Sequence, residues 1–438
     1  MVSIRAITAA AVVAVASVAA EESKDLYHVR VPKPVFEMVY KNHGSELDIW
    51  ETRVEGDFVE VDVYGTAATV QKFQGVDSLL ESSTAEAVIE SAPVSMRSQI
   101  ESEQTDIQAC QRQTDGYLKK LSAPYADNGF FDCWRTAEQV FEFIDALVAK
   151  NPKYITKIEG VTKTAEGRSV PAYKISTGSS AKKKALYAQG LIHAREWSSG
   201  ASVHYALAAF LDGINSNDAS VMQIFEEYDW YIVPILNIDG FKYTWTKDRM
   251  WRKNRRAFTK NGRTYYGVDL NRNFGPKEFF DKDGKSRNPN DEAYPGDKVL
   301  SEPESAGIFN FIKSIKGLAG TIDVHMYAQS VLRPFSNQGN EAPEPYGSKM
   351  KALGDAVRDA IQEGSSVQYD SAPSFSGIYY SYGTFKDSMF LEMGNIASFT
   401  LELEGDSFVT EQSAIKDVGS RLFNSFKRFS TEMKNYLA

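Results

Sequence analysis

Short apolar runs alternate with longer segments of helical periodicity from about residue 136 to the end of the chain. The runs predict strands at residues 184–191, 230–236, 321–324 and 398–403, and the periodic segments predict helices at residues 136–148, 199–211, 302–315, 346–361 and 414–437. Strands that alternate with helices form a largely parallel sheet that is covered on both faces. We therefore predict an α/β fold with a mixed, largely parallel central sheet, and we expect ligands at the carboxyl ends of its strands.

Two of the predicted strands end beside residues that can bind a metal ion. His193 and Glu196 lie three residues apart after the first strand, and His325 follows the run at residues 320–324. The H-x-x-E spacing alone also fits a surface histidine beside a solvated glutamate. The remaining histidines lie in an acidic N-terminal region or within a predicted helix, where a core or flanking position is expected. Two close ligands, one remote ligand and an open position are typical of catalytic zinc sites.

Other residues could supply the groups that a zinc-bound water and its substrate need. Glu402 interrupts an apolar run, either as a solvent-facing residue of an edge strand or as a general base. Cations gather at residues 248–256 and 267–274, and the second segment contains Asn271 and Arg272. A charge cluster is usually a solvated surface. An arginine, however, can grip a carboxylate with two parallel hydrogen bonds, and an asparagine adds a neutral donor.

The N-terminal part of the chain has a different character. Residues 1–20 combine a positive charge, an apolar stretch and small residues, which predicts a secretory signal peptide, although a buried helix would also fit. In residues 21–97 acidic side chains outnumber basic ones, and short alternating strands and helices predict a small open-sheet α/β domain. Residues 98–128 are polar and predict an exposed connector. Possible protease sites in or beside this connector are Arg97, Arg112, Lys119 and Lys120.

Cysteine content and charge limit the classes of partner. Cys110 and Cys133 are the two cysteines, and in a secreted chain they predict one disulfide, with a pair of free buried thiols as the alternative. The net charge of −9 and the lack of a basic tract argue against a nucleic-acid partner. Beyond the signal peptide, no apolar stretch is long enough to cross a bilayer, so we expect no membrane partner.

Five motifs together resemble one family. His193-Ala-Arg-Glu-Trp, Arg249-Met-Trp-Arg-Lys, Val268-Asp-Leu-Asn-Arg-Asn, the strand-end His325 and Phe399-Thr-Leu-Glu-Leu resemble the zinc metallocarboxypeptidases of the pancreatic carboxypeptidase A/B type. The resemblance extends from about Thr136 to the C-terminus. It implies a zinc exopeptidase with its catalytic domain at residues 129–438, preceded by an inhibitory pro-domain at residues 21–97 and a connector with the activation site at residues 98–128.

The resemblance also implies a role for each motif residue. One Zn²⁺ would be bound by His193, Glu196 and His325. Glu402 would be the general base and then the acid, and Arg252 would stabilise the oxyanion. Asn271 and Arg272 would hold the terminal carboxylate of the substrate, which explains why an internal peptide bond is not cut. The supporting residues would be Arg195 and Tyr327 against the peptide, Asp269 orienting His193, and Arg249 beside Glu196.

The family has a mobile tyrosine that closes over the substrate, and here it would be Tyr379 or Tyr380. The two alternatives give different specificity pockets. Counting from Tyr379 places Lys386 at the base of the pocket and favours acidic C-terminal residues, and this is the alternative that we prefer. Counting from Tyr380 places Asp387 there and favours lysine or arginine. Ser388, Met389 and Met326 depart from the family pattern.

The implied protein is a secreted, extracellular and monomeric zymogen that acts on peptide or protein C-termini after cleavage by an activating endoprotease. Two other functions fit the same fold. One is a non-catalytic secreted binding protein, whose expected signature would be loss of Glu402 or a metal ligand. The other is a different zinc amidohydrolase, against which the pair Asn271 and Arg272 argues.

Overall fold

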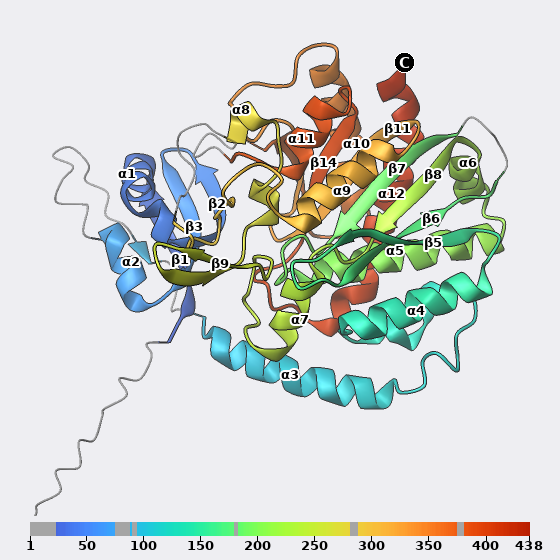
Figure 1. Cartoon of the computed structure of the whole chain (residues 1–438), viewed down its shortest axis with the longest axis horizontal. Coiled ribbons are helices and arrows are strands. Elements are labelled where there is room, and N and C mark those ends of the chain that lie inside the picture. Colours follow the sequence, from blue (N-terminus) through green and yellow to red (C-terminus); the bar gives the residue numbers. More distant parts are fainter. Residues whose placement is uncertain (1–22, 75–87, 90–93, 179–182, 281–287, 375–380) are drawn as a thin grey trace, which may run out of the picture.

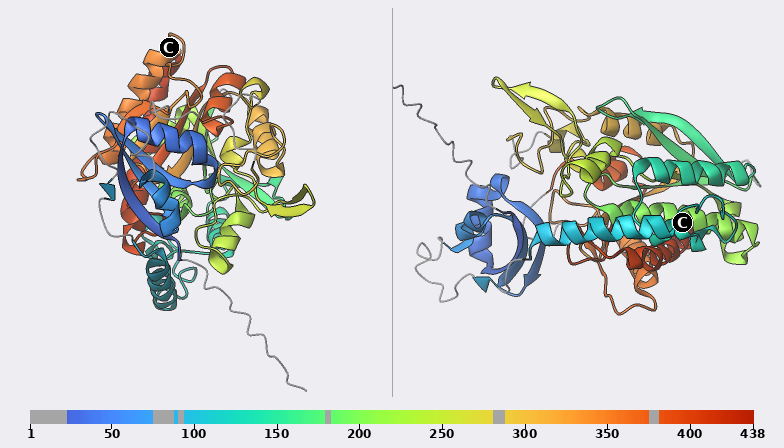
Figure 2. Two further views of the ribbon diagram at one scale, coloured as in Figure 1. Left: turned by 90° about the vertical axis from the view of Figure 1, so that its left-hand side faces the viewer. Right: turned by 90° about the horizontal axis from the view of Figure 1, so that it is seen from below.

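The structure is a computed structural model, and it describes residues 23–438 except 75–87, 90–93, 179–182, 281–287 and 375–380 (Figure 1). The predicted signal peptide, Tyr379 and Tyr380 lie outside the described residues. A large α/β domain forms most of the molecule, and a small domain lies at one end of it (Figure 2). No helix in the described part of the chain is long and apolar enough to cross a membrane.

The large domain is built on an eight-stranded sheet with the order β13-β12-β14-β11-β7-β8-β6-β5. Its centre is parallel and consists of β14 (Ala397–Leu403), β11 (Leu318–Met326), β7 (Lys184–Gly190) and β8 (Tyr228–Val233). Antiparallel pairs join β6 (Ser169–Ile175) to β8, β5 (Ile155–Lys163) to β6, and β12 (Ser330–Arg333) to β14, while β13 (Asp370–Pro373) runs parallel to β12. The predicted mixed, largely parallel sheet is confirmed.

Side chains alternate along each strand, so the buried sheet presents an apolar surface on both faces, and helices cover each of them. Gly190 in β7 faces α5 (Trp197–Asn215), where an added Cβ would lie 3.1 Å from the backbone of Ser199. Tyr187, at an alternate position of β7, instead pairs with Phe385 of α11 (Phe385–Glu392). Gly320 of β11 meets Phe429 of α12 (Ile415–Leu437) on the α5 side.

Further helices of the large domain are α4 (Ala137–Lys150), α6 (Ala219–Glu227), α7 (Ile238–Thr246), α8 (Lys277–Phe280), α9 (Pro303–Ser314) and α10 (Tyr346–Gln362). The predicted start of α4 is confirmed, since Thr136 and Gln139 form a reciprocal capping box there. A short hairpin of β9 (Ala257–Lys260) and β10 (Arg263–Tyr266) projects from the domain.

The small domain, which we call the N-terminal domain (residues 23–94), has its own sheet with the order β2-β3-β1-β4. Its strands β1 (Asp25–Pro32), β2 (Asp48–Glu55), β3 (Phe58–Gly65) and β4 (Val88–Ile89) are antiparallel, and α1 (Lys33–His43) and α2 (Ala67–Gln74) pack with them around an apolar core. The predicted small α/β domain of short strands and helices is confirmed for the described residues of this segment.

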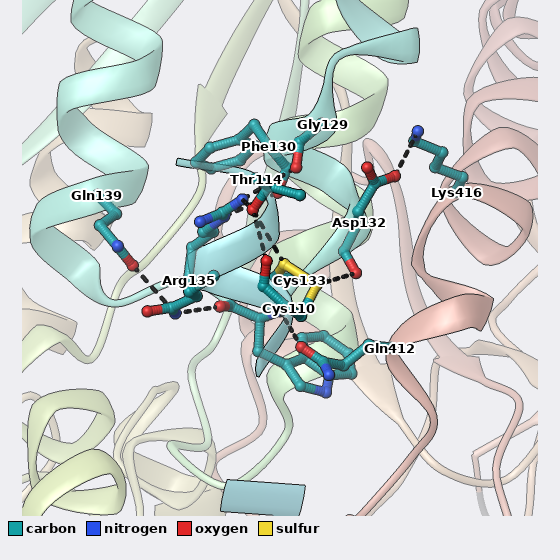
Figure 3. The surroundings of a disulfide bond; sticks show 12 residues. Cys110, Thr114, Gly129, Phe130, Asp132, Cys133, Arg135, Gln139, Gln412 and Lys416 are labelled. Atoms are coloured by element: carbon teal, nitrogen blue, oxygen red, sulfur yellow. Dashed lines mark hydrogen bonds and ion pairs between the residues drawn. A yellow bond between two sulfur atoms is a disulfide. The ribbon is translucent and has the colours of Figure 1, made fainter. Parts of the chain in front are cut away.

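The segment after it, residues 98–128, is predicted to be an exposed connector. It joins the two domains, and most of its residues up to Lys120 are exposed or half-buried, but much of it also forms the helix α3 (Met96–Gln113), which runs along the large domain (Figure 2). Only Met96, Glu103 and Ile107 are buried on this helix, so its sequence shows little apolar periodicity. The predicted disulfide is present: Cys110 of α3 is bonded to Cys133, with the Cα atoms 5.8 Å apart (Figure 3).

Candidate active site and metal centre

Three side chains meet where β7 and β11 end. His193 and Glu196 follow β7, and His325 lies near the end of β11. The Nδ1 atom of His193 lies 2.7 Å from Glu196 Oε1, and the Nδ1 atom of His325 lies 3.1 Å from Glu196 Oε2. Their potential ligand atoms all lie within 4.8 Å of one another, and the three residues are buried. Two imidazoles and a carboxylate are a donor set of catalytic zinc sites.

Each histidine is oriented by a second carboxylate. The Nε2 atom of His193 lies 3.1 Å from Asp269 Oδ1, and the Nε2 atom of His325 lies 2.8 Å from Asp323 Oδ2. A proton held on Nε2 by these carboxylates leaves Nδ1 free to bind a metal. Asp269 is the residue that the family resemblance implies as the partner of His193. Asp323 was missed, although its position two residues before His325, as a carboxylate in an otherwise apolar strand, is a recognisable signal.

The electrostatics favour a divalent cation at this position. Burial alone would raise the pKa of Glu196, but the imidazoles of His193 and His325 hold it below its ordinary value. Burial would likewise raise the pKa of Asp269, and Arg252 together with His193 holds it well below that value. The carboxylates are therefore ionised at neutral pH. The buried set fits Zn²⁺ both in its donor atoms and in its negative charge.

Glu402 lies beside the metal ligands because β14 is the parallel neighbour of β11. In this register Glu402 pairs directly with His325, so both side chains project from the same face of the sheet. Loss of hydration raises the pKa of Glu402 to about 7, although His325 opposes the shift. A carboxyl with a pKa near neutrality can both accept and release a proton during a reaction. This register favours the interpretation of Glu402 as a general base over that of a solvent-facing residue on an edge strand.

Arg252 reaches the same centre from another segment. Its Nε and Nη2 atoms lie 3.1 and 3.0 Å from Asp269 Oδ2, and its Nη1 atom lies 3.8 Å from Glu196 Oε1. Asp269 thus contacts both the histidine ligand and the arginine. The side chain of Arg252 keeps 15% of its surface exposed, so a substrate atom can reach it.

A second cluster lies next to the metal centre. Asn271 lies 3.3 Å from His325 through its Nδ2 atom, and its Oδ1 atom accepts a hydrogen bond from the backbone of Phe385 at 2.7 Å. Arg272 donates to the Asn271 carbonyl oxygen at 2.9 Å, which keeps its guanidinium beside the asparagine. The predicted carboxylate-binding pair is therefore close to the predicted zinc ligands, at the start of α11.

Lys386 and Asp387, the two candidate specificity residues, lie next to this cluster and contact each other. Lys386 Nζ donates to Asp387 Oδ1 at 2.8 Å and to Ser336 Oγ at 2.6 Å, while Asp387 Oδ2 accepts from the Ser336 backbone at 2.8 Å. Each oxygen of Asp387 thereby accepts one hydrogen bond. An ammonium group has three donor hydrogens, so Lys386 retains one for a further acceptor.

Comparison with known proteins agrees with this geometry. A profile described as zinc carboxypeptidase matches residues 140–425. The chain belongs to the zinc carboxypeptidase family.

Human carboxypeptidase A1 is 31% identical over 316 residues, which cover 72% of each chain. An inactive metallocarboxypeptidase of Sclerotinia sclerotiorum is 28% identical over 340 residues, which cover 71% of this chain and 56% of that protein. The crystal structure of carboxypeptidase A from Helicoverpa armigera has a TM-score of 0.79 at 24% identity and covers 94% of this chain and 98% of that chain, which shows a shared fold. The protein is a metallocarboxypeptidase, and its cofactor is zinc.

In this carboxypeptidase the N-terminal domain contacts three residues around the site. Asp48 of β2 forms two hydrogen bonds with Arg195, at 2.8 and 2.9 Å, and Asp62 of β3 accepts one from Tyr327 at 2.8 Å. The ring of Trp50 lies 4.6 Å from that of Phe408 and 5.2 Å from the Arg195 guanidinium. These contacts could not be predicted from the sequence, because nothing local to β2 indicates which distant residues it will contact.

Arg249 has partners other than the expected one. We expected it to support Glu196, but its guanidinium donates to Glu103 at 2.7 and 3.1 Å, to the Arg195 carbonyl at 2.9 Å and to the Phe408 carbonyl at 2.7 Å. That expectation is wrong in its partner. Arg249 instead fixes the backbone that carries Arg195 and joins it to helix α3.

Proposed function

We propose that this protein is a secreted, monomeric carboxypeptidase that is made as a zymogen and removes the C-terminal residue of peptides and proteins. The register that places Glu402 beside His325 carries the catalytic part of the proposal. When bound, Zn²⁺ would polarise the scissile carbonyl and make its bound water more acidic. Glu402 then accepts a proton from the attacking water and delivers it to the leaving amine.

The neighbouring residues complete the reaction. Arg252 donates to the carbonyl oxygen as negative charge develops there, and Asp269 holds the guanidinium in place for this role. Asn271 and Arg272 bind the terminal carboxylate of the substrate, with Arg195 and Tyr327 along the peptide. An internal peptide bond brings no carboxylate to this pair, so the enzyme cuts only at the C-terminus. The exopeptidase reading thus follows from the charge of the pocket.

The site residues argue against a non-catalytic binding protein. His193, Glu196, His325, Glu402 and Arg252 are all present in this chain. Amino-acid release from short peptides that end in Glu, Lys, Phe or Leu, measured after limited proteolysis with and without a zinc chelator, tests the proposal. Chelator-sensitive release of the last residue supports it. A zinc-loaded, proteolysed protein that releases no amino acid contradicts it.

The pocket favours acidic C-terminal residues. Lys386 has one donor hydrogen left for a substrate carboxylate, and Asp387 accepts hydrogen bonds from Lys386 and from the Ser336 backbone. A hydrogen bond to a charged group contributes about 1.5–3 kcal/mol, so Lys386→Met is expected to lower kcat/KM for a C-terminal Glu by roughly 10- to 100-fold. Peptides that end in Leu provide the comparison and should change little. An unchanged Glu-to-Leu ratio would exclude Lys386 as the selecting residue.

We further propose that the N-terminal domain is an inhibitory pro-domain. Asp48, Trp50 and Asp62 cover Arg195 and Tyr327, which a bound peptide would need. Removing one partner of such a charge pair costs about 2 kcal/mol or more. We therefore expect Asp48→Asn to weaken binding of the N-terminal domain over the site by roughly 30-fold or more. The activity of the uncleaved chain is expected to rise relative to the cleaved enzyme. Asp57→Asn, in the exposed β2–β3 turn, is the matched control. If the activity of the uncleaved chain, relative to the cleaved enzyme, were the same in both variants, the result would count against the proposal.

A further inference from the structure

Helix α3 joins the N-terminal domain to the catalytic domain. It contacts β1 of the N-terminal domain, whereas its buried ion pair and its disulfide are with the catalytic domain. Met96 and Ile107 belong to the large apolar core that contains Phe131, Trp134 and residues of the central sheet, and Leu26 of β1 is the residue of the N-terminal domain that is buried in it. The N-terminal domain has a separate core, formed by residues of β1, β3, α1 and α2. By packing, therefore, α3 is part of the catalytic domain.

A buried ion pair fastens the middle of α3. Glu103 and Arg249 form two hydrogen bonds, and each side chain keeps only 3% of its surface exposed. The guanidinium also stacks on Trp197, 3.8 Å from the ring centre. Separating the two would leave a buried charge without its partner, which typically costs several kcal/mol. The pair also connects α3 to Arg195, because Arg249 holds the carbonyl oxygen of that residue.

The C-terminal part of α3 is fixed covalently. The Cys110–Cys133 disulfide joins the helix to the segment before α4 (Figure 3). Gln111 also donates to the Trp134 carbonyl at 2.8 Å. Arg135 adds a hydrogen bond to Thr114 at 2.8 Å. A chain that is cut between Cys110 and Cys133 therefore keeps its two pieces joined by the disulfide.

Basic residues divide the possible cuts into two groups. No lysine or arginine lies between Lys72 and Arg97, or between Arg97 and Arg112. The Arg97 side chain is 83% exposed at the start of α3. Cleavage there separates the N-terminal domain from the helix, whereas cleavage after Arg112, Lys119 or Lys120 leaves it attached through α3 and the disulfide.

We propose that α3 remains in the active enzyme, and that only a cut on the N-terminal side of Cys110 frees the N-terminal domain. This inference rests on the proposed zymogen function. A cut beyond Cys110 leaves the inhibitory domain tethered at an effective concentration of roughly millimolar, so it continues to cover the site. The disulfide thus selects which proteolytic cut activates the enzyme.

Two versions of the full chain test the proposal. Each carries one recognition sequence for a site-specific endoprotease, inserted between residues 90 and 91 or between Asp115 and Gly116. After cleavage, size-exclusion chromatography without reductant follows the N-terminal fragment, and peptide hydrolysis follows the activity. The first version should release the fragment on dilution and become active. The second should retain its fragment and stay at least 10-fold less active by order of magnitude, as expected of a tethered inhibitor. In a Cys110→Ser/Cys133→Ser background only the noncovalent contacts of α3 and of the N-terminal domain hold the fragment, so the second version should retain less of its fragment on dilution than it does with the disulfide intact.

Two results would overturn the proposal. One is a fragment that separates from the second version without reductant, and the other is full activity while that fragment is still attached. If neither version hydrolyses peptides while the fragments separate as expected, the proposed enzymatic function fails and the assignment of α3 stands. The unmodified chain gives a check without insertions. The smallest active species that trypsin produces should contain Cys110 bonded to Cys133, and an active species without residues 98–110 would refute the role of α3.

Discussion

Replacing Glu402 with glutamine is expected to lower kcat/KM for C-terminal hydrolysis by roughly a thousand-fold, the middle of the range for loss of a general acid–base. Glutamine has nearly the same shape but cannot accept the proton of the attacking water. The chain should still fold, because Glu402 lies in β14 next to His325 without being one of the three grouped metal-ligand candidates. Zinc content, measured by atomic spectroscopy, should stay at the level of the unmodified enzyme.

Glu404 provides a matched control for this substitution. It lies two residues further along the chain, and its carboxylate is paired with Arg421 and Tyr369 outside the metal centre. Glu404→Gln therefore removes one charge from the same strand end without touching the reaction. If kcat/KM of Glu402→Gln were within about ten-fold of that of the unmodified enzyme, a different group would have to accept the proton.

The zinc ligands could be predicted from the sequence because they are tied to strand ends. His193 and His325 each follow a clear apolar run, and parallel strands bring their carboxyl ends to the same edge of a sheet. Asp269 and Arg252 followed from motif resemblance. Asp323 could have been found from its position in β11, where a charged residue in a buried strand requires a partner.

The contacts of the N-terminal domain could not be predicted in the same way. Asp48 and Arg195 are 147 residues apart, and each lies in an ordinary local pattern. Helix α3 was missed because one of its three buried residues, Glu103, is charged, so the helix has no apolar stripe. Burial of Glu103 becomes favourable only when Arg249 is placed opposite it, which depends on the complete fold.

The edges of the central sheet were also missed, for a different reason. Strand β5 alternates irregularly between exposed and half-buried positions, and β12 and β13 have four residues each. Such strands are held by pairing with neighbours more than by their own apolar pattern. The central strands β7, β11 and β14 are buried on both faces and appear in the sequence as nearly continuous apolar runs.

Removal of a zinc ligand is expected to have the largest effect on the protein. His325→Ala leaves Glu196 and His193 as the remaining two ligands of the buried set, and a catalytic zinc site needs three protein ligands. Bound zinc should fall close to zero after dialysis, and peptide hydrolysis should fall to background. His43→Ala is the control, because that histidine is partly exposed in the N-terminal domain and lies outside the metal centre.

The orienting carboxylate should give a graded result. Asp323→Asn keeps all three ligands but removes the charge that holds the Nε2 proton of His325 at 2.8 Å, and losses of this kind weaken metal binding by roughly 10- to 100-fold. Zinc affinity, titrated against a competing chelator, should therefore fall between those of the unmodified chain and His325→Ala. A zinc affinity equal to that of the unmodified chain would mean that Asp323 only fills space in β11. A loss as complete as that of His325→Ala would mean that the strand end itself depends on this carboxylate.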